Sequence, residues 1–300
     1  MADGVGWLSR EMYPFESHYL ELDVGRLHYI DEGSGAPVVM VHGNPAWSFL
    51  YRHLIRRLTP EFRCVAPDHI GFGLSDKPTG RSLRPQDHAE NLAELIDTLA
   101  LKDITLVVQD WGGPIGLSYA IREPENVARL VIMNTWLWPV DDDWYYVAFS
   151  RFMGGAFGRF LIMRHNFFAR VIMRQAYGDK RNLTSDIHEH YLRPLATPAE
   201  RRNCAALPGE ILGSTEWLRD LWAQRDRLQG KPALVAWGLK DIAFREKELD
   251  RWTRALPDAE VVRLPEVGHF VQEEAPEELG QAVSRLLEVE ARRNTRETAV

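Results

Sequence analysis

The sequence predicts an α/β protein whose mostly parallel, eight-stranded sheet is flanked by helices and interrupted by an inserted helical segment. Three observations support this prediction. Strand-like apolar runs alternate with helical patterns along most of the chain, as in doubly wound sheets. The central runs are continuously apolar, which is typical of parallel strands that are covered on both faces. One long segment breaks the alternation, because it contains helical patterns and no strand-like run.

The expected strands are short apolar runs. In chain order they are Tyr19–Val24, Arg26–Asp31, Val38–His42, Arg63–Ala66, Ile104–Val108, Leu130–Met133, Ala233–Trp237 and Val261–Leu264. Helical patterns lie at Ser48–Leu58, Gln86–Leu101, Gly113–Arg122, Lys247–Ala255 and Pro276–Glu290. Such an order is typical of a sheet that carries helices on both faces.

The alternation of strands and helices stops after Met133. From Trp136 to about Arg225 the chain shows repeated amphipathic helical segments, such as Phe152–Gln175 and Leu218–Leu228. We therefore expect a helical cap inserted into a sheet domain. The expected boundaries are residues 1–135 for the first part of the core, 136–225 for the cap and 226–300 for the second part of the core.

The composition of the chain is typical of a cytoplasmic enzyme. A formal net charge of -7 argues against a nucleic-acid partner. Two cysteines in 300 residues are too few for a disulfide framework. The first residues lack the basic and apolar regions of a signal peptide, and no uncharged apolar run is long enough to span a membrane. We therefore expect a cytoplasmic location and no membrane partner.

The stretch from Val107 to Pro114 places an acid between an apolar strand and the glycines that open a helix. In the pattern G-x-S-x-G, a sharp strand-to-helix turn exposes a nucleophilic serine at the top of a sheet, and Asp110 stands where that serine would be. A serine that attacks saturated carbon becomes an ether, whereas a carboxylate becomes an ester that water can hydrolyse. Asp110 therefore indicates displacement at an sp3 carbon, in a carbon–halogen bond or an epoxide. The alternative is an ordinary helix cap.

Two further residues make a hydrolytic route possible. Asp241 and His269 follow other strand candidates, and the carboxyl ends of parallel strands are where ligands bind. Nucleophile, acid and histidine come in the chain order typical of hydrolases with such sheets. Asp110 needs no base to ionise, so His269 is better suited to take a proton from the water that cleaves the ester. Asp241 would orient the imidazole and stabilise the cation that forms.

Together these motifs resemble the haloalkane dehalogenases of the α/β-hydrolase superfamily. The segments that carry the resemblance are His42–Pro45, Pro67–Ser75, Gln109–Gly113, Asp241 and Gly268–His269, and the likeness spans about Leu20 to Leu287. It implies an α/β-hydrolase fold with a cap, and hydrolysis of haloalkanes to an alcohol, a halide and a proton through an alkyl ester on Asp110. The expected partners are a small apolar halogenated substrate and water, with no cofactor and no metal.

Asn44 and Trp111 are the candidate halide-binding residues. A departing halide needs donors that do not compete as nucleophiles, and an indole N–H and a carboxamide NH2 meet this need. The resemblance assigns these two residues as the halide pair, and their backbone N–H groups are candidates for the oxyanion hole. Core packing for Trp111 and turn formation for Asn44 are the alternatives.

Asn134 bears on the choice of the acid that supports the histidine. Some dehalogenases place this acid after the strand that here ends at Ile132-Met133-Asn134, where the present chain has a neutral residue. Asp241 is therefore the better candidate. This resembles the subfamily that combines a late aspartate with an Asn–Trp halide pair.

Two other functions stay open at this point. An epoxide hydrolase would share the Asp110 nucleophile but needs acids for the ring oxygen, and four cap tyrosines could supply them: Tyr145, Tyr146, Tyr177 and Tyr191. A non-catalytic ligand receptor on a hydrolase scaffold is the other alternative.

The predicted cap also contains five arginines spaced along its first helical patterns: Arg151, Arg159, Arg164, Arg170 and Arg174. They predict a solvated helix face, with contact between copies in a homo-oligomer as the alternative.

Overall fold

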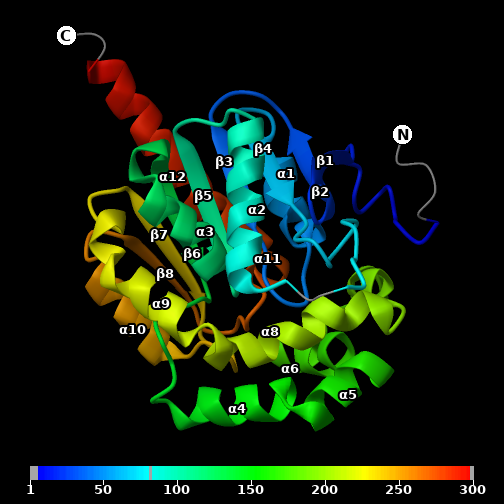
Figure 1. Cartoon of the computed structure of the whole chain (residues 1–300). Helices are drawn as coiled ribbons and strands as arrows, with labels where there is room; N and C mark the ends of the chain where they lie inside the picture. The colour runs from blue at the N-terminus through cyan, green and yellow to red at the C-terminus, as the bar shows by residue number, and fades with distance from the viewer. Residues whose placement is uncertain (1–5, 81–82, 298–300) are drawn as a thin grey trace.

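The computed structural model describes residues 6–80 and 83–297, and it contains the expected eight-stranded sheet (Figure 1). The strand order is β1-β2-β4-β3-β5-β6-β7-β8. The strands are β1 (His18–Leu22), β2 (Gly25–Glu32), β3 (Pro37–Val41), β4 (Arg63–Pro67), β5 (Ile104–Gln109), β6 (Val127–Met133), β7 (Ala233–Gly238) and β8 (Glu260–Leu264). The predicted fold class is therefore confirmed.

The sheet is mostly parallel. Only β1 with β2 and β2 with β4 pair in the antiparallel sense, and every pair from β4 to β8 is parallel. All residues of β5 and β7 are buried, as their continuous apolar sequences predict for strands covered on both faces. The carboxyl ends of the parallel strands consequently meet along one edge of the sheet.

Helices cover both faces of the sheet and bury a separate apolar cluster on each. One cluster includes α2 (Pro85–Thr98), α3 (Gly112–Arg122) and α10 (Glu246–Ala255). The other includes α1 (Arg52–Leu58), α11 (Val271–Glu274) and α12 (Pro276–Glu297). The short 3-10 helices η1 (Ser48–Tyr51) and η2 (Pro124–Asn126) lie in connections.

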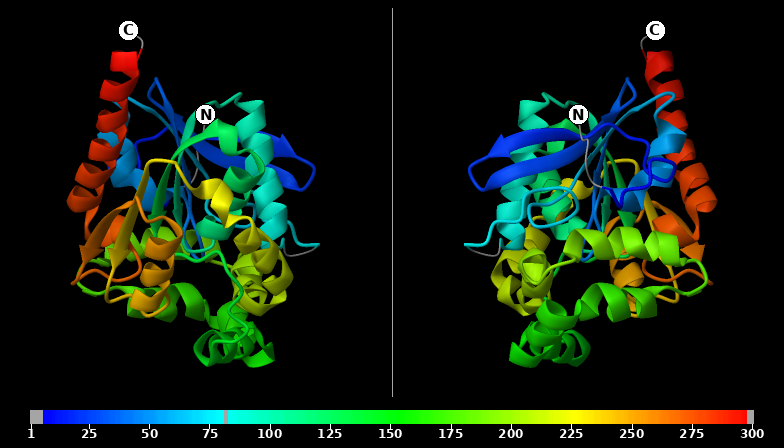
Figure 2. Two further views of the ribbon diagram at one scale, coloured as in Figure 1. Left: turned by 90° about the vertical axis from the view of Figure 1, so that its left-hand side faces the viewer. Right: turned by 90° about the vertical axis from the view of Figure 1, so that its right-hand side faces the viewer.

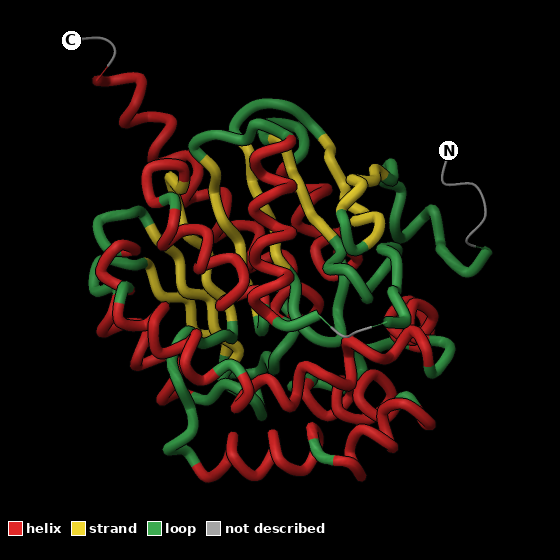
Figure 3. The backbone as a smooth tube through the Cα atoms, viewed as in Figure 1, coloured by secondary structure: helices red, strands yellow, loops and turns green. Residues whose placement is uncertain are grey.

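Between β6 and β7 the chain forms a layer of helices at one end of the sheet (Figure 3), and we call these the cap helices. They are α4 (Trp144–Gly154), α5 (Ala156–His165), η3 (Phe168–Ile172), α6 (Met173–Ala176), α7 (Ser185–Leu192), η4 (Arg193–Leu195), η5 (Ala199–Arg201), α8 (Arg202–Gly213), α9 (Thr215–Ala223) and η6 (Arg225–Leu228). In the part of the chain that the structure describes, no helix combines the length and apolar character needed to cross a bilayer.

The predicted helical segment Phe152–Gln175 differs from the structure, because it is broken twice. Gly155 has an extended backbone (ψ 174°) between α4 and α5, and Asn166 ends α5 in the left-handed region (φ 54°). Asparagine accepts the left-handed conformation more readily than most residues, and at Gly155 a Cβ atom would lie 2.4 Å from the Arg151 carbonyl oxygen, so the chain changes direction at both positions. The two breaks let short helices wrap around the end of the sheet.

Candidate active site

The turn from β5 to α3 holds Asp110 in the left-handed region, with φ at 51°. Two glycines make this turn possible. A Cβ atom on Gly43 would lie 2.1 Å from Asp110 Oδ1, and one on Gly112 would lie 2.0 Å from the Val41 carbonyl oxygen. The α3 helix begins at Gly112 without a side-chain cap. The sharp turn that the sequence predicts is therefore present, and Asp110 is not an ordinary helix cap.

Backbone N–H groups hold the Asp110 carboxylate. The N–H of Asn44 donates to Oδ1 over 2.7 Å, and the N–H of Trp111 also donates to the carboxylate. Burial raises the pKa of the Asp110 carboxyl above its ordinary value, although nearby His269 and the two N–H bonds act in the opposite direction. The backbone groups predicted to form an oxyanion hole thus already contact the carboxylate.

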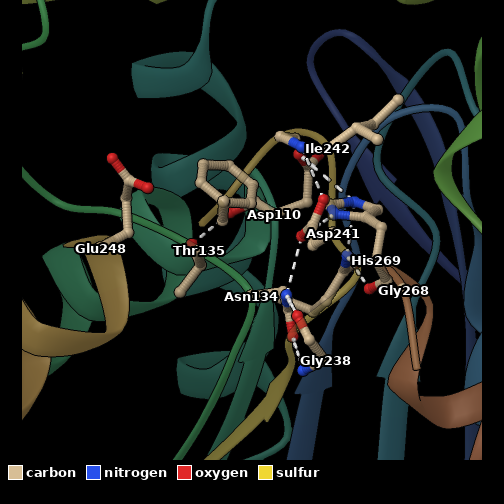
Figure 4. Close-up of polar contacts among 12 residues, drawn as sticks. Asp110, Asn134, Thr135, Gly238, Asp241, Ile242, Glu248, Gly268 and His269 are labelled. Carbon is tan, nitrogen blue, oxygen red and sulfur yellow. Dashed lines mark hydrogen bonds and ion pairs between the residues drawn. The ribbon is translucent and has the colours of Figure 1, made fainter. Parts of the chain in front are cut away.

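His269 lies between the two acids (Figure 4). Its Nδ1 is 2.8 Å from Asp241 Oδ2, and its Nε2 is 3.8 Å from Asp110 Oδ2. Burial by itself would lower the pKa of the His269 imidazole, but the charge and hydrogen bond of Asp241 and the charge of Asp110 together raise it. The structure therefore brings together the three residues that the sequence predicts as nucleophile, base and supporting acid.

Asn134 and Gln109 support this group from the ends of β6 and β5. Asn134 Nδ2 donates to Asp241 Oδ2 over 2.7 Å, and Asn134 Oδ1 accepts from the Gly238 N–H. Gln109 Nε2 lies 2.7 Å from His269 Nε2. A carboxamide NH2 only donates, so this contact favours an unprotonated Nε2 with the proton on Nδ1. Sequence reasoning missed both roles, and the available signal was that each polar side chain ends an apolar strand.

The loop that carries His269 is tied to the cap helices. The His269 N–H donates to the Ala176 carbonyl oxygen over 2.8 Å. The Glu274 carboxylate accepts from the N–H groups of Gly178, Asp179 and Gly268 at 3.2, 2.9 and 2.9 Å. The Glu274 carboxylate therefore joins Gly178 and Asp179, which follow α6, to the loop that carries His269.

A cavity of about 90 Å³ lies between the carboxyl ends of the strands and the cap helices. Asp110 and His269 line it, together with both predicted halide residues, Asn44 and Trp111. The rest of the lining is mainly apolar: Pro45, Trp136, Tyr145, Tyr146, Phe149, Phe168, Ile172, Met173, Ala176, Pro208, Ile211, Ile242, Ala243, Phe244 and Phe270. The nucleophile thus faces a space that suits a small apolar molecule.

The two halide candidates differ in their contacts. Asn44 Nδ2 donates one of its two N–H groups to the Cys204 carbonyl oxygen over 3.2 Å. This bond orients the amide and leaves the second N–H available to a halide. Trp111 is buried and packs edge-to-face on Trp136, with 4.6 Å between ring centroids. Both side chains are held in place by neighbours, as a preorganised anion site requires.

The four cap tyrosines are not arranged as acids for a substrate oxygen. Tyr145 and Tyr146 line the cavity, but their hydroxyls donate to the carbonyl oxygens of Ile242 and Ala243 over 2.6 and 2.8 Å. Tyr191 donates to Glu273, and Tyr177 packs on Phe270 outside the lining of the cavity.

The chain is similar to several known proteins. Residues 36–276 match the family model described as the alpha/beta hydrolase fold. Haloalkane dehalogenase 2 of Mycobacterium tuberculosis is 40% identical over 275 residues, which cover 91% of this chain and 95% of the relative. A cis-3-alkyl-4-alkyloxetan-2-one decarboxylase of Shewanella oneidensis is 37% identical over 280 residues, covering 89% and 87%. The crystal structure of haloalkane dehalogenase DbeA from Bradyrhizobium elkani superimposes with a TM-score of 0.84 at 28% identity, covering 92% and 99%.

Proposed function

Because this chain belongs to the haloalkane dehalogenase family of the α/β hydrolases, we propose that it hydrolyses haloalkanes to an alcohol, a halide and a proton. One observation carries the proposal. The Asp110 carboxylate, on a strained turn, faces an apolar cavity with His269 Nε2 at 3.8 Å from its Oδ2. A buried carboxylate beside a base can first form an ester and then have it hydrolysed.

In the first step Asp110 Oδ2 attacks the halogen-bearing carbon and forms a C–O bond. The carbon–halogen bond breaks, and the halide takes the electron pair. The side-chain N–H groups of Trp111 and Asn44 line the same cavity and would stabilise the negative charge of the departing halide. No base is needed in this step, because the carboxylate is the nucleophile.

In the second step water attacks the carboxyl carbon of the ester, and His269 Nε2 accepts its proton. Asp241, at 2.8 Å from Nδ1, would stabilise the imidazolium that forms. The N–H groups of Asn44 and Trp111 would hold the negative oxygen of the tetrahedral intermediate. Collapse of this intermediate releases the alcohol and restores Asp110, with one proton left over for solvent.

The segment 136–225 would act as the cap in this proposal. Its helices supply much of the apolar lining, including Phe149, Phe168 and Pro208. Exclusion of water strengthens the electrostatic interactions of the site and limits competing reactions. Cap geometry would consequently set the size of substrate that the cavity accepts.

Epoxide hydrolysis is less well supported. It needs a proton donor for the ring oxygen, whereas the hydroxyls of Tyr145 and Tyr146 already donate to backbone carbonyl groups. A binding protein without catalysis is disfavoured by the complete arrangement of Asp110, His269 and Asp241.

Decarboxylation of an oxetan-2-one is a second candidate function, because a relative of that name is 37% identical to this chain. Loss of CO2 from such a four-membered lactone leaves an alkene and consumes no water. The negative charge that develops when the ring C–O bond opens could be stabilised by the same donors, Asn44 and Trp111. This reaction needs no hydrolysis of an ester on Asp110.

A panel of substrates tests the proposal. We expect bromide release from 1-bromobutane or 1,2-dibromoethane well above the rate without enzyme, measured with a halide assay. An aliphatic epoxide and a cis-3,4-dialkyloxetan-2-one serve as parallel substrates, with diol and alkene as their products. Background bromide release together with turnover of either parallel substrate would refute haloalkane hydrolysis. Inactivity on all three would favour the receptor.

The pH dependence should separate the two steps. His269 must be neutral to accept a proton, so kcat is expected to fall as the pH drops through the pKa of its imidazole; in the ester, burial lowers this pKa and the charge and hydrogen bond of Asp241 raise it. Below that value, alkylation of ionised Asp110 should still release one halide per site, in a burst seen by rapid-quench measurement. A kcat that stays constant down to about pH 4 would exclude His269 as the base.

A further inference from the structure

The outward surface of α4 and α5 carries large apolar side chains. Trp144 is 77% exposed, Phe152 54%, Phe157 60% and Phe160 56%. These two helices form the outermost layer of the cap helices, at the end of the molecule away from both termini (Figure 2). The exposed aromatic side chains therefore gather where no described part of the chain covers them.

Helical periodicity places the exposed residues of α4 on one face, whereas α5 is exposed over most of its circumference, with Phe157, Phe160 and Arg164 on one side. On α4 the exposed residues are Trp144, Ala148, Arg151 and Phe152, and on α5 they include Phe157, Arg159, Phe160 and Arg164. We call these eight residues the outer cap face. The rings of Phe152 and Phe157 lie 5.9 Å apart and connect the two helices. The outer cap face is thus one continuous surface.

The opposite faces of the same helices are also apolar. Met153 of α4 and Ile162 of α5 are buried in the core, and Phe149 of α4 lines the cavity. A surface helix of a globular protein normally turns a polar face outward. An apolar character on both faces instead indicates a helix that is buried on both sides. The outer cap face consequently has the character of an interface.

Charge of one sign is confined to the segment that begins at Trp144, because three aspartates, Asp141–Asp143, directly precede it. The segment from Trp144 to Gly178 contains five arginines and no aspartate or glutamate, in a chain whose net charge is -7. All five arginines are exposed, and none pairs with a carboxylate of residues 6–80 or 83–288 within 4.0 Å. A surface that combines unpaired arginines with Phe and Trp side chains matches a partner that is anionic at its surface and apolar below it.

We propose that the outer cap face docks this protein onto the surface of an anionic lipid bilayer. Arginine side chains would contact the lipid phosphates, and Trp144, Phe152, Phe157 and Phe160 would enter the boundary between headgroups and acyl chains. A duplex nucleic acid fits less well, because its phosphate surface covers no apolar layer that the four exposed aromatic side chains could enter. Docking at the surface needs no spanning helix, and if it occurs it would replace the sequence-based expectation of no membrane partner.

The position of the cavity suggests how docking would serve the proposed reaction. The α4 helix contributes Tyr145, Tyr146 and Phe149 to the cavity from the side opposite its exposed residues. An apolar substrate that partitions into lipid would therefore be concentrated directly against the helix that covers the nucleophile. The docking itself is independent of the proposed reaction, and its test does not use activity.

Co-sedimentation with vesicles tests this proposal on the full chain. The protein is expected to pellet with vesicles of phosphatidylglycerol and phosphatidylcholine, and to stay in solution with phosphatidylcholine alone. The double variants Phe157→Ser/Phe160→Ser and Arg151→Glu/Arg159→Glu should each lower the partition coefficient by about tenfold or more. Raising the ionic strength should release the wild-type protein, because screening weakens the attraction to lipid phosphate.

Matched variants away from the cap separate a local effect from a general one. Lys102→Glu/Arg263→Glu makes the same change of charge at exposed positions outside the cap helices, and Tyr19→Ser removes an exposed aromatic ring from β1. Both controls should bind vesicles as the wild type does. Circular dichroism checks that every variant is folded.

Two outcomes would overturn the docking proposal. The first is equal binding by the outer cap face variants and the control variants. The second is that the wild-type protein does not bind the vesicles but forms a dimer in solution, measured by light scattering, whereas the outer cap face variants are monomeric. That second result would make this face a contact between copies. Neither result affects the expected halide release, since no residue of the outer cap face lines the cavity.

Discussion

Replacing His269 with Phe is expected to stop turnover after one halide per active site and to leave an alkyl adduct on Asp110. The carboxylate can still attack the substrate, because alkylation needs no base. Hydrolysis of the ester then lacks the imidazole, which lies 3.8 Å from Asp110 Oδ2 in the wild type. Mass spectrometry of the peptide that contains Asp110 should show the added alkyl group, and steady-state turnover should fall by roughly 10⁴-fold or more.

The wild-type enzyme treated in the same way is the control, and its peptide should be unmodified. An unmodified peptide in the His269→Phe variant after long incubation would contradict the roles proposed for both residues. The same variant also bears on the second candidate function. Decarboxylation consumes no water, so continued alkene formation by His269→Phe would separate it from haloalkane hydrolysis.

Replacing Asp110 with Asn should eliminate the burst of halide release and lower the steady-state rate of halide release by roughly 10⁴-fold or more. Asparagine is the suitable replacement because it has the size of aspartate and tolerates the left-handed backbone at φ 51°. Halide release is measured alongside a melting curve, which should show a folded protein. Since water activated by His269 could slowly hydrolyse the new amide, an intact mass spectrum must confirm that the asparagine persists. Near wild-type activity in a verified sample of the Asp110→Asn variant is the result that would exclude Asp110 as the nucleophile.

The sheet and the three central site residues could be predicted from the sequence for a common reason. Strands buried on both faces require continuous apolar runs, and such runs are distinct from the helical patterns beside them. Asp110 then stands out because an acid directly after a buried strand is costly unless it has partners. His269 is one such partner, and Asp241 in turn contacts His269; both follow Asp110 in the expected chain order.

The supporting residues were harder to predict. Asn134 was interpreted only as the absence of an acid, yet its amide donates to Asp241 Oδ2 over 2.7 Å. Gln109 contributed to the family resemblance but had no predicted role, and it lies 2.7 Å from His269 Nε2. Such roles depend on which strands are neighbours, and β6 lies beside β7 only in the folded sheet.

The cap was the least predictable part for a physical reason. Its helices are apolar on more than one face, so periodicity cannot tell the side that meets the cavity from the side that faces outward. The arginines were expected to mark a solvated face and are exposed, but Phe152, Phe157 and Phe160 are exposed among them, which the pattern did not indicate. The breaks at Gly155 and Asn166 also depend on packing around the end of the sheet rather than on local pattern alone.

The Glu274 carboxylate joins the chain after α6 to the histidine loop, and in the proposed reaction this would couple substrate range to rate. Any displacement of Gly178 and Asp179 that enlarged the cavity at this corner would pull on Gly268 and shift the neighbouring imidazole. New substrates would then be gained here only with slower ester hydrolysis. The α4 helix is linked to the same imidazole, because Tyr146 donates to the Ala243 carbonyl oxygen, the Ala243 N–H donates to Asp241, and Asp241 contacts His269. A substitution that enlarges the cavity from either corner is therefore expected to widen the substrate range at the expense of slower ester hydrolysis.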